Sequence, residues 1–219
     1  MKKHNIVFLS VLSVIFLFAL FLSFFGHVYP SKVELKECNN KINSLHVDPS
    51  LFIPQTFNNC GPYAATAAIN ILYGELNNPE TLAKETKYRI IKNLTLPQGV
   101  VKLLHDHNVK TKQYILKHKN MEEKVIFLKN QIDMGHPVIL LLKIGEVLHY
   151  VTVLGYNEKG FMIFDSAMPE RKDNPSRTVI DKECSEGNCF SSFYYLTHLW
   201  SDGGVGPFFN SYAIVCSKK

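Results

Sequence analysis

The chain has 219 residues, 46% of them hydrophobic, and a formal net charge of +5 at pH 7. That length suffices for one domain with a sizeable core. The charge is modest, and the sequence holds neither an aromatic stacking motif nor a zinc finger, so it gives no indication of a nucleic-acid-binding module. We therefore expect a globular protein without a nucleic-acid partner.

The first element in chain order is an uncharged apolar stretch over residues 6–25. At about 1.5 Å per residue, a helix of that length spans roughly 30 Å, the thickness of a bilayer's hydrocarbon core. We expect a transmembrane signal-anchor helix over 6–26, after a cytoplasmic N-terminus (1–5) and before a tether (27–50). Cleavage near Gly26 and a segment that does not enter a membrane are the alternatives. The remainder is expected on the extracytoplasmic side, membrane-anchored in the first case and secreted in the second.

Helical signals dominate the first half of the next region, residues 51–219, which we expect to form one domain. Small and aliphatic residues recur at helical spacing behind Cys60. The tripeptide Asn78-Pro79-Glu80 combines an N-cap residue, a proline at the first helical position and an acidic first turn. These signals predict helices over residues 60–73, 79–92, 97–107 and 121–134.

Beyond Gly135 the pattern changes to short aliphatic runs and alternation, which are typical of strands. We predict strands over residues 138–143, 147–156, 161–165 and 208–216, the second and third forming a hairpin across residues 157–160. The stretch 168–207 is polar apart from an aromatic cluster at Phe190–Trp200. Helices followed by antiparallel strands indicate an α+β domain, with N-terminal helices packed on an antiparallel sheet.

The five cysteines of the chain fit an oxidising compartment, where an odd count suggests two disulfides and one free thiol. Cys184 and Cys189 are spaced to close a small loop, and Cys38 and Cys216 to join the two ends of the domain. This pairing is a hypothesis, and it leaves Cys60 as the free thiol. No second Cys/His pair lies near Cys184 and Cys189, so we expect no metal site.

Three residues are candidates for thiol chemistry. Cys60 lies at a predicted helix N-terminus, where the helix dipole favours a thiolate. His149 begins one strand of the predicted hairpin and Asp165 ends the other. The hairpin places about residue 152 opposite Asp165, so a bulge or register offset is needed to join His149 to Asp165. A carboxylate that orients the histidine of a Cys–His pair is typical of thiol hydrolases, although each residue alone also has a structural explanation.

Four stretches of the sequence resemble the C39-like branch of the papain-like cysteine peptidases. They are QTFNNCGPYAA at 55–65, GHPVILLL at 135–142, HYVTVLGYN at 149–157 and FMIFDSA at 161–167. The resemblance implies a papain-like fold without a metal or organic cofactor. It also implies roles for four residues: a nucleophile, Cys60, a general base, His149, an orienting acid, Asp165, and the side-chain donor of an oxyanion hole, Gln55.

We therefore expect a membrane-anchored, exported thiol hydrolase that cleaves an amide bond in a peptide or protein substrate through an acyl-enzyme. Removal of double-glycine leaders is not expected, because the family's leader peptidases work in the cytosol on ABC transporters and this chain has no P-loop. Two alternatives stay open. One is a non-catalytic papain-like module that binds peptides at the membrane surface, and the other is a deamidase or transglutaminase-type enzyme on the same scaffold.

Overall fold

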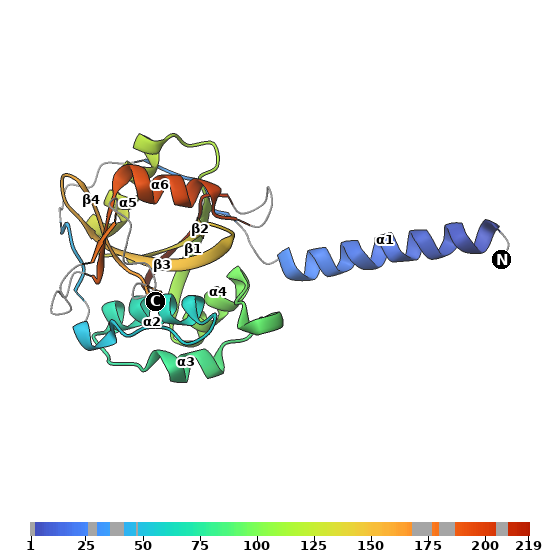
Figure 1. Cartoon of the computed structure of the whole chain (residues 1–219), viewed down its shortest axis with the longest axis horizontal. Helices are drawn as coiled ribbons and strands as arrows, with labels where there is room; N and C mark the ends of the chain where they lie inside the picture. The colour runs from blue at the N-terminus through green and yellow to red at the C-terminus, as the bar shows by residue number, and fades with distance from the viewer. Residues whose placement is uncertain are drawn as a thin grey trace.

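One antiparallel sheet forms the middle layer of the domain (Figure 1). The computed structural model describes residues 3–25, 30–35, 42–46, 48–167, 177–179, 187–204 and 210–219. Within these ranges seven strands pair in the order β1-β7-β2-β3-β4-β6-β5. Their bounds are β1 Val109–Ile115, β2 Val138–Ile144, β3 Val147–Tyr156, β4 Gly160–Phe164, β5 Arg177–Val179, β6 Cys189–Ser192 and β7 Tyr212–Lys218.

Helices cover both faces of this sheet (Figure 1). One face carries α2 (Cys60–Tyr73), α3 (Pro79–Glu85) and α4 (Pro97–Asp106), and the other carries α5 (Met121–Asp133) and α6 (Phe193–Asp202). Two 3-10 turns, η1 (Pro49–Leu51) and η2 (Ile91–Asn93), lie before and after the first two of these helices. A buried apolar cluster fills each side of the sheet. The predicted α+β class with an antiparallel sheet is therefore confirmed.

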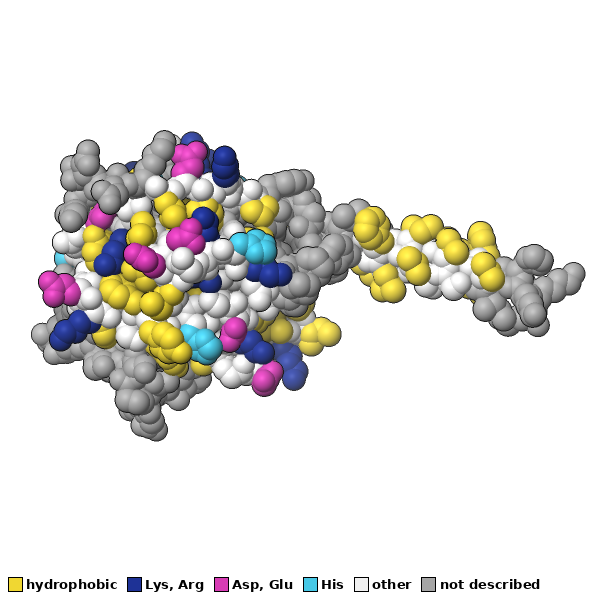
Figure 2. All heavy atoms as spheres, turned by 90° about the horizontal axis from the view of Figure 1, so that it is seen from above, with side chains coloured by type: hydrophobic (Ala, Val, Ile, Leu, Met, Phe, Trp, Pro, Cys, Tyr) yellow, Lys and Arg dark blue, Asp and Glu magenta, His cyan; other side chains and the backbone are white. Residues whose placement is uncertain are grey.

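Helix α1 (Lys3–Phe25) projects away from the domain, and Figure 2 shows hydrophobic side chains along its outside. The prediction of a transmembrane helix over 6–26 is nevertheless wrong, because no helix among the described residues is long and apolar enough to cross a membrane.

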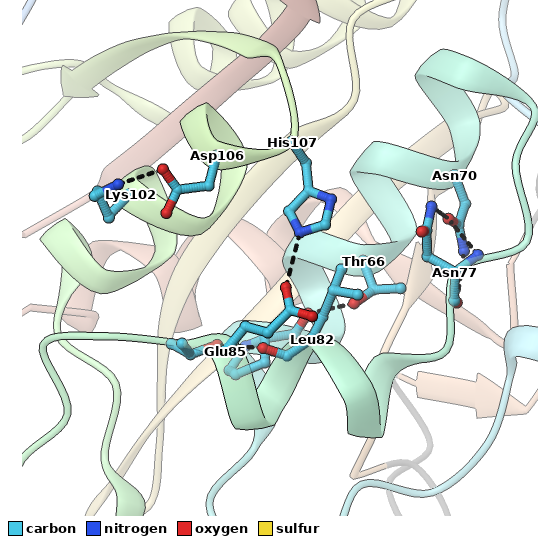
Figure 3. Close-up of polar contacts among 10 residues, drawn as sticks. Thr66, Asn70, Asn77, Leu82, Glu85, Lys102, Asp106 and His107 are labelled. Atoms are coloured by element: carbon cyan, nitrogen blue, oxygen red, sulfur yellow. Dashed lines mark hydrogen bonds and ion pairs between the residues drawn. The ribbon is translucent and has the colours of Figure 1, made fainter.

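Polar side chains fix the helical layer that carries Cys60 (Figure 3). The side-chain oxygen of Asn70 on α2 accepts a hydrogen bond from the backbone N–H of Asn77 at 3.0 Å, just before α3. At the other end of that helix, Glu85 contacts His107, the C-cap residue of α4, with 3.3 Å between the carboxylate oxygen and Nε2. The three helices thus form one unit beneath the sheet.

Helix α3 ends at Glu85, seven residues before the predicted end at Lys92. The chain becomes extended at Thr86, whose hydroxyl donates to the carbonyl of Leu82 at 2.8 Å. The guanidinium of Arg89 donates to the carbonyl of Ala83 at 3.2 Å. Side chains therefore satisfy carbonyls that a longer helix would have bonded through its backbone.

Three strands, β1, β5 and β6, and the helix α6 lie where no element was predicted. Strand β1 carries Lys110 and Lys112 on alternate positions and forms an edge of the sheet beside β7. Helix α6 occupies the aromatic cluster, and the hydroxyl of Ser192 caps its first turn by accepting from the N–H of Tyr195 at 3.3 Å. A single Ser N-cap inside an aromatic run is a weak helix signal, which explains the omission.

The predicted Cys38–Cys216 disulfide is wrong, because Cys216 is a free thiol. This residue is fully buried in the apolar cluster on the α2 side of the sheet. Burial there raises the pKa of the Cys216 thiol, because the thiolate loses its hydration. Cys38 and Cys184 lie outside the described residues, so the Cys184–Cys189 pairing stays a prediction.

Trp200 anchors α6 to the sheet, and its removal will destabilise the domain. The indole is fully buried, and its N–H donates to the carbonyl of Tyr212 on β7 at 2.7 Å. We expect Trp200→Ala to lower the free energy of unfolding by about 3–5 kcal/mol in urea denaturation. Tyr194→Ala is the control on the same helix: its ring is 71% exposed, so the change should stay within about 0.5 kcal/mol. Equal losses in both variants would contradict this role of Trp200.

Candidate active site

Cys60 is the first residue of α2, at the end of the helix where backbone N–H groups are unsatisfied. The N-cap residue Asn59 does not cap the helix with its side chain; the side chain bonds to Thr56 and Arg89 instead. Gly61 lets another segment approach closely, since a Cβ at this position would lie 3.0 Å from the Cβ of Thr95. The helix start is thus left open to interact with the thiol.

Asp165 follows β4 and holds His149 of β3. The distance from His149 Nε2 to Asp165 Oδ1 is 2.7 Å, and the two side chains are 2% and 0% exposed. The same carboxylate oxygen accepts from the backbone N–H of Ala167 at 2.8 Å. Asn188 bonds to both backbone groups of Asp165, at 2.8 and 2.9 Å. The carboxylate is therefore held in place by contacts on two segments of the chain.

A β-bulge brings these two residues together. The hairpin register is Tyr156↔Phe161 near the turn but Thr152↔Phe164 farther along, with a one-residue shift between Val153 and Gly155. Residue 152 therefore faces residue 164. Without a bulge, the predicted loop would have placed residue 152 opposite Asp165. The extra residue moves Asp165 one position toward His149, which confirms the offset that the sequence required.

Helix α2 and strand β3 are tied directly beside these residues. The hydroxyl of Thr152 donates to the carbonyl of Ala64 at 2.9 Å in the buried layer between them. Thr152 lies three positions after His149, and Ala64 lies four positions after Cys60. One buried hydrogen bond thus sets the helix carrying the thiol against the strand carrying the imidazole.

The surroundings of Cys60 favour its thiolate. Burial acts most strongly and raises the pKa of Cys60, but it is outweighed by the hydrogen bond and the charge of His149 and by the backbone N–H groups of Tyr150 and Gly61, so that the net pKa is lowered. Because His149 uses Nε2 for Asp165, Nδ1 is the ring nitrogen that faces the thiol. The structure therefore brings Cys60, His149 and Asp165 into one chain of contacts.

Gln55, the fourth candidate, contacts Ser166, the residue that follows Asp165. Its backbone N–H donates to the carbonyl of Ser166 at 2.9 Å, and the hydroxyl of Ser166 donates to Gln55 Oε1 at 2.7 Å. Among the described contacts no hydrogen bond joins Gln55 to Cys60. The bond to Ser166 fixes the amide and leaves its NH₂ group available to another acceptor.

Cys60 opens onto a pocket of about 400 Å³ that the sequence did not reveal. The walls are mainly apolar and come from the loop before α4 and from the residues ahead of His149. The lining residues are Asn58, Cys60, Ile90, Leu94, Thr95, Leu96, Pro97, Leu141, Glu146, Val147, Leu148 and Tyr150. Four separate segments contribute, so no local motif signals the pocket.

Neither a metal centre nor a second, larger cavity is associated with this site among the described residues. Within the described ranges, no group of three or more His, Cys, Asp or Glu side chains is placed to hold a metal ion. A cavity of about 600 Å³ lies beside β1 and α5, and none of Cys60, His149 and Asp165 lines it. The chemistry is therefore assigned to the smaller pocket, where the perturbed thiol lies.

Comparison with known proteins identifies a family. A sequence model of the Peptidase_C39 like family matches residues 41–194. The match spans more than half of the chain and includes Gln55, Cys60, His149 and Asp165. No curated protein matches the chain.

Three solved structures are similar to the chain, two of them with a TM-score of at least 0.50. A putative C39-like peptidase from Bacillus anthracis has 13% identity and a TM-score of 0.51, over 80% of this chain and 98% of that one. A double glycine motif protease from an AMS/PCAT transporter, in complex with the leader peptide, has 13% identity and a TM-score of 0.50, over 84% and 100%. The peptidase domain of Streptococcus ComA, a bi-functional ABC transporter involved in a quorum sensing pathway, has 15% identity and a TM-score of 0.48, over 81% and 99%.

Proposed function

Because the chain belongs to the Peptidase_C39 like family, we propose that it is a cysteine peptidase that cleaves a peptide bond with Cys60, His149 and Asp165. One observation supports this above the others. A thiol with a lowered pKa at a helix N-terminus faces a histidine whose far nitrogen is bonded to a buried carboxylate. Nucleophile, base and orienting group are the three parts that thiol hydrolysis requires.

The proposed reaction proceeds through a thioester. The thiolate of Cys60 attacks the scissile carbonyl carbon, and the S–C bond forms while the carbonyl electrons move to oxygen. The tetrahedral intermediate collapses, the C–N bond breaks, and protonated His149 gives its Nδ1 proton to the departing amine. Neutral His149 then takes a proton from water, whose oxygen attacks the thioester and releases the acid and the free thiolate. Asp165 holds the ring through Nε2 in both steps.

The oxyanion of the intermediate is proposed to bind to the backbone N–H of Cys60 and to the side-chain NH₂ of Gln55. The bond from Ser166 occupies the oxygen of the Gln55 amide, so only its nitrogen remains as a donor. Two preorganised donors of this kind stabilise the transition state more than the bound substrate.

This role predicts the behaviour of Gln55 variants. Gln55→Ala should lower kcat by about 10²- to 10³-fold, because one oxyanion donor is lost, with little change in KM. Gln55→Glu should lose at least as much, since it replaces the donor with a negative charge. Ser166→Ala removes only the bond that orients the amide and should have the smaller effect in the same steady-state assay. Wild-type kcat in Gln55→Glu would rule Gln55 out of the oxyanion hole.

A peptide is the proposed substrate. A structurally similar protease was solved in complex with a leader peptide, and the apolar pocket beside Cys60 suits an aliphatic side chain near the scissile bond. Incubation of the purified protein with a mixed peptide library, followed by mass spectrometry, tests the proposal. Peptides cut at a common motif, in a reaction blocked by prior treatment with iodoacetamide, would support it. Deamidated or amine-linked products would indicate amide transfer instead, and unchanged peptides would indicate a binding module.

A further inference from the structure

Arg89 is the centre of a hydrogen-bond network beside the thiol. Its Nη2 donates to the side-chain oxygen of Asn59 at 2.5 Å and to the carbonyl of Asn58 at 3.2 Å. The carbonyl of Asn93 accepts from Nε and Nη2 at 3.0 and 2.6 Å. The carbonyl of Ala83 accepts from Nη1 at 3.2 Å. The guanidinium thus joins the end of α3, the loop after it and the residues directly before Cys60.

The segments that Arg89 joins are those that build the site. Asn58 and Asn59 immediately precede the nucleophile, and Asn58 also lines the pocket beside it. On either side of Asn93, Ile90 and Leu94 form part of the apolar wall. One side chain therefore links the position of the thiol to the position of the wall that a substrate would touch.

The backbone of these segments depends on side-chain contacts. Asn58, Tyr88, Lys92 and Asn93 all have φ between +52° and +62°, a region that non-glycine residues rarely occupy. Such conformations persist only where surrounding contacts enforce them. The bonds from Arg89 to Asn58 and Asn93 are among the contacts that do so.

The charge of Arg89 also acts on the thiol. Burial lowers the pKa of Arg89, while attraction to Cys60 and Glu80 raises it. By Coulomb's law the same attraction acts on the thiolate, beside the larger effects of burial, His149 and the backbone N–H groups on the pKa of Cys60. Among the described residues, the other ionisable groups that act on the thiol or line its pocket are His149 and Tyr150 on β3 and Glu146 in the preceding turn.

We propose that Arg89 is a positioning residue for the nucleophile: its guanidinium fixes the loop from which α2 and Cys60 start, and its positive charge favours the thiolate. The inference rests on the proposed peptidase function. The fork of donors and the charge are separable, because lysine keeps the charge but cannot span several carbonyls.

Three variants separate these contributions. Arg89→Gln removes both the branched set of donors and the charge, whereas Arg89→Lys removes the branched set of donors alone. Lys110→Gln removes one exposed charge from β1 and is the control. For each we would measure kcat and KM on a peptide that the wild type cleaves. The rate of Cys60 alkylation by iodoacetamide between pH 5 and 10 would be followed by peptide mass spectrometry, with thermal unfolding recorded on the same samples.

Arg89→Gln should lower kcat by about 10²-fold through a displaced nucleophile. It should also slow alkylation at neutral pH about three- to tenfold, with the pH curve moved upward. Arg89→Lys should lower kcat but keep the wild-type pH curve, and Lys110→Gln should change neither. Low millimolar guanidinium should partly restore the alkylation rate of Arg89→Gln.

Two results would overturn the inference. One is a folded Arg89→Gln protein with wild-type kcat and pH curve. The other is a loss of kcat in both Arg89 variants that only follows the folded fraction, with no change in the pH curve of Arg89→Gln. An unreactive Cys60 in the wild type would instead contradict the proposed function, and with it the inference. A reactive wild type with an unaltered Arg89→Gln contradicts the inference alone.

Discussion

A Cys60→Ala variant is expected to lose peptide cleavage, with kcat/KM lowered by roughly 10⁴- to 10⁶-fold, the range found when a hydrolase loses its covalent nucleophile. The structural reason is that the methyl group of alanine cannot form the thioester, and no second thiol with a lowered pKa lies beside His149 among the described residues. The fold should survive, because Cys60 is only half-buried and is replaced by a good helix former at the start of α2.

The matched control for this variant is Cys216→Ala. Cys216 is also a free thiol, but it is fully buried, and burial raises its pKa. We expect this variant to keep wild-type cleavage and wild-type labelling by an iodoacetamide probe at neutral pH. In Cys60→Ala the labelling of the 60–73 helix should disappear together with turnover. Cleavage that persists in Cys60→Ala would exclude Cys60 as the nucleophile.

The elements that carry the site could be predicted because their signals are local. Small residues behind Cys60 predicted α2 over the range that the structure shows, and the alternation ahead of Tyr156 predicted β3 with the same bounds. Helical spacing and strand alternation both lie within the element that they predict, so neither signal depends on a long-range contact.

The relation between these elements was harder to predict. The bulge between Val153 and Gly155 determines whether His149 meets Asp165. Both registers place β-branched and aliphatic residues of this strand in buried positions, because β3 is covered by helices on both faces. The hydrophobic pattern therefore does not discriminate between them. Only the need of the imidazole for a partner indicated that an offset was required.

The contribution of Arg89 had no sequence signal at all. Its region contains good helix formers, so the sequence predicted helix as far as Lys92, whereas the structure ends α3 at Glu85. The helix ends early because Arg89 bonds to carbonyls at Ala83 and Asn93 and to the Asn59 side chain. These partners lie up to 30 residues from Arg89 in the sequence, and such tertiary contacts override local propensity.

Asp165→Ala is expected to lower kcat by about 10³- to 10⁴-fold while leaving KM nearly unchanged. The carboxylate fixes His149 through Nε2 at 2.7 Å in a fully buried position. Without it the imidazole can turn or change tautomer, and Nδ1 no longer faces the thiol with a proton to transfer. Asp202→Ala is the matched control, because Asp202 also faces a histidine, His198, but at 4.0 Å and with 60% of its side chain exposed. That variant should keep wild-type kcat.

Asp165→Asn separates orientation from charge. Oδ1 of Asp165 accepts from both His149 and the N–H of Ala167, and the carbonyl oxygen of an asparagine can accept both bonds in the same place. We therefore expect a smaller loss than in the alanine variant, because orientation is kept and only the stabilisation of the imidazolium is weakened. Single-turnover acylation rates would measure the effect on the chemical step. Equal losses in the two variants would assign the role of Asp165 to its charge, and a wild-type rate in Asp165→Ala would remove it from the mechanism.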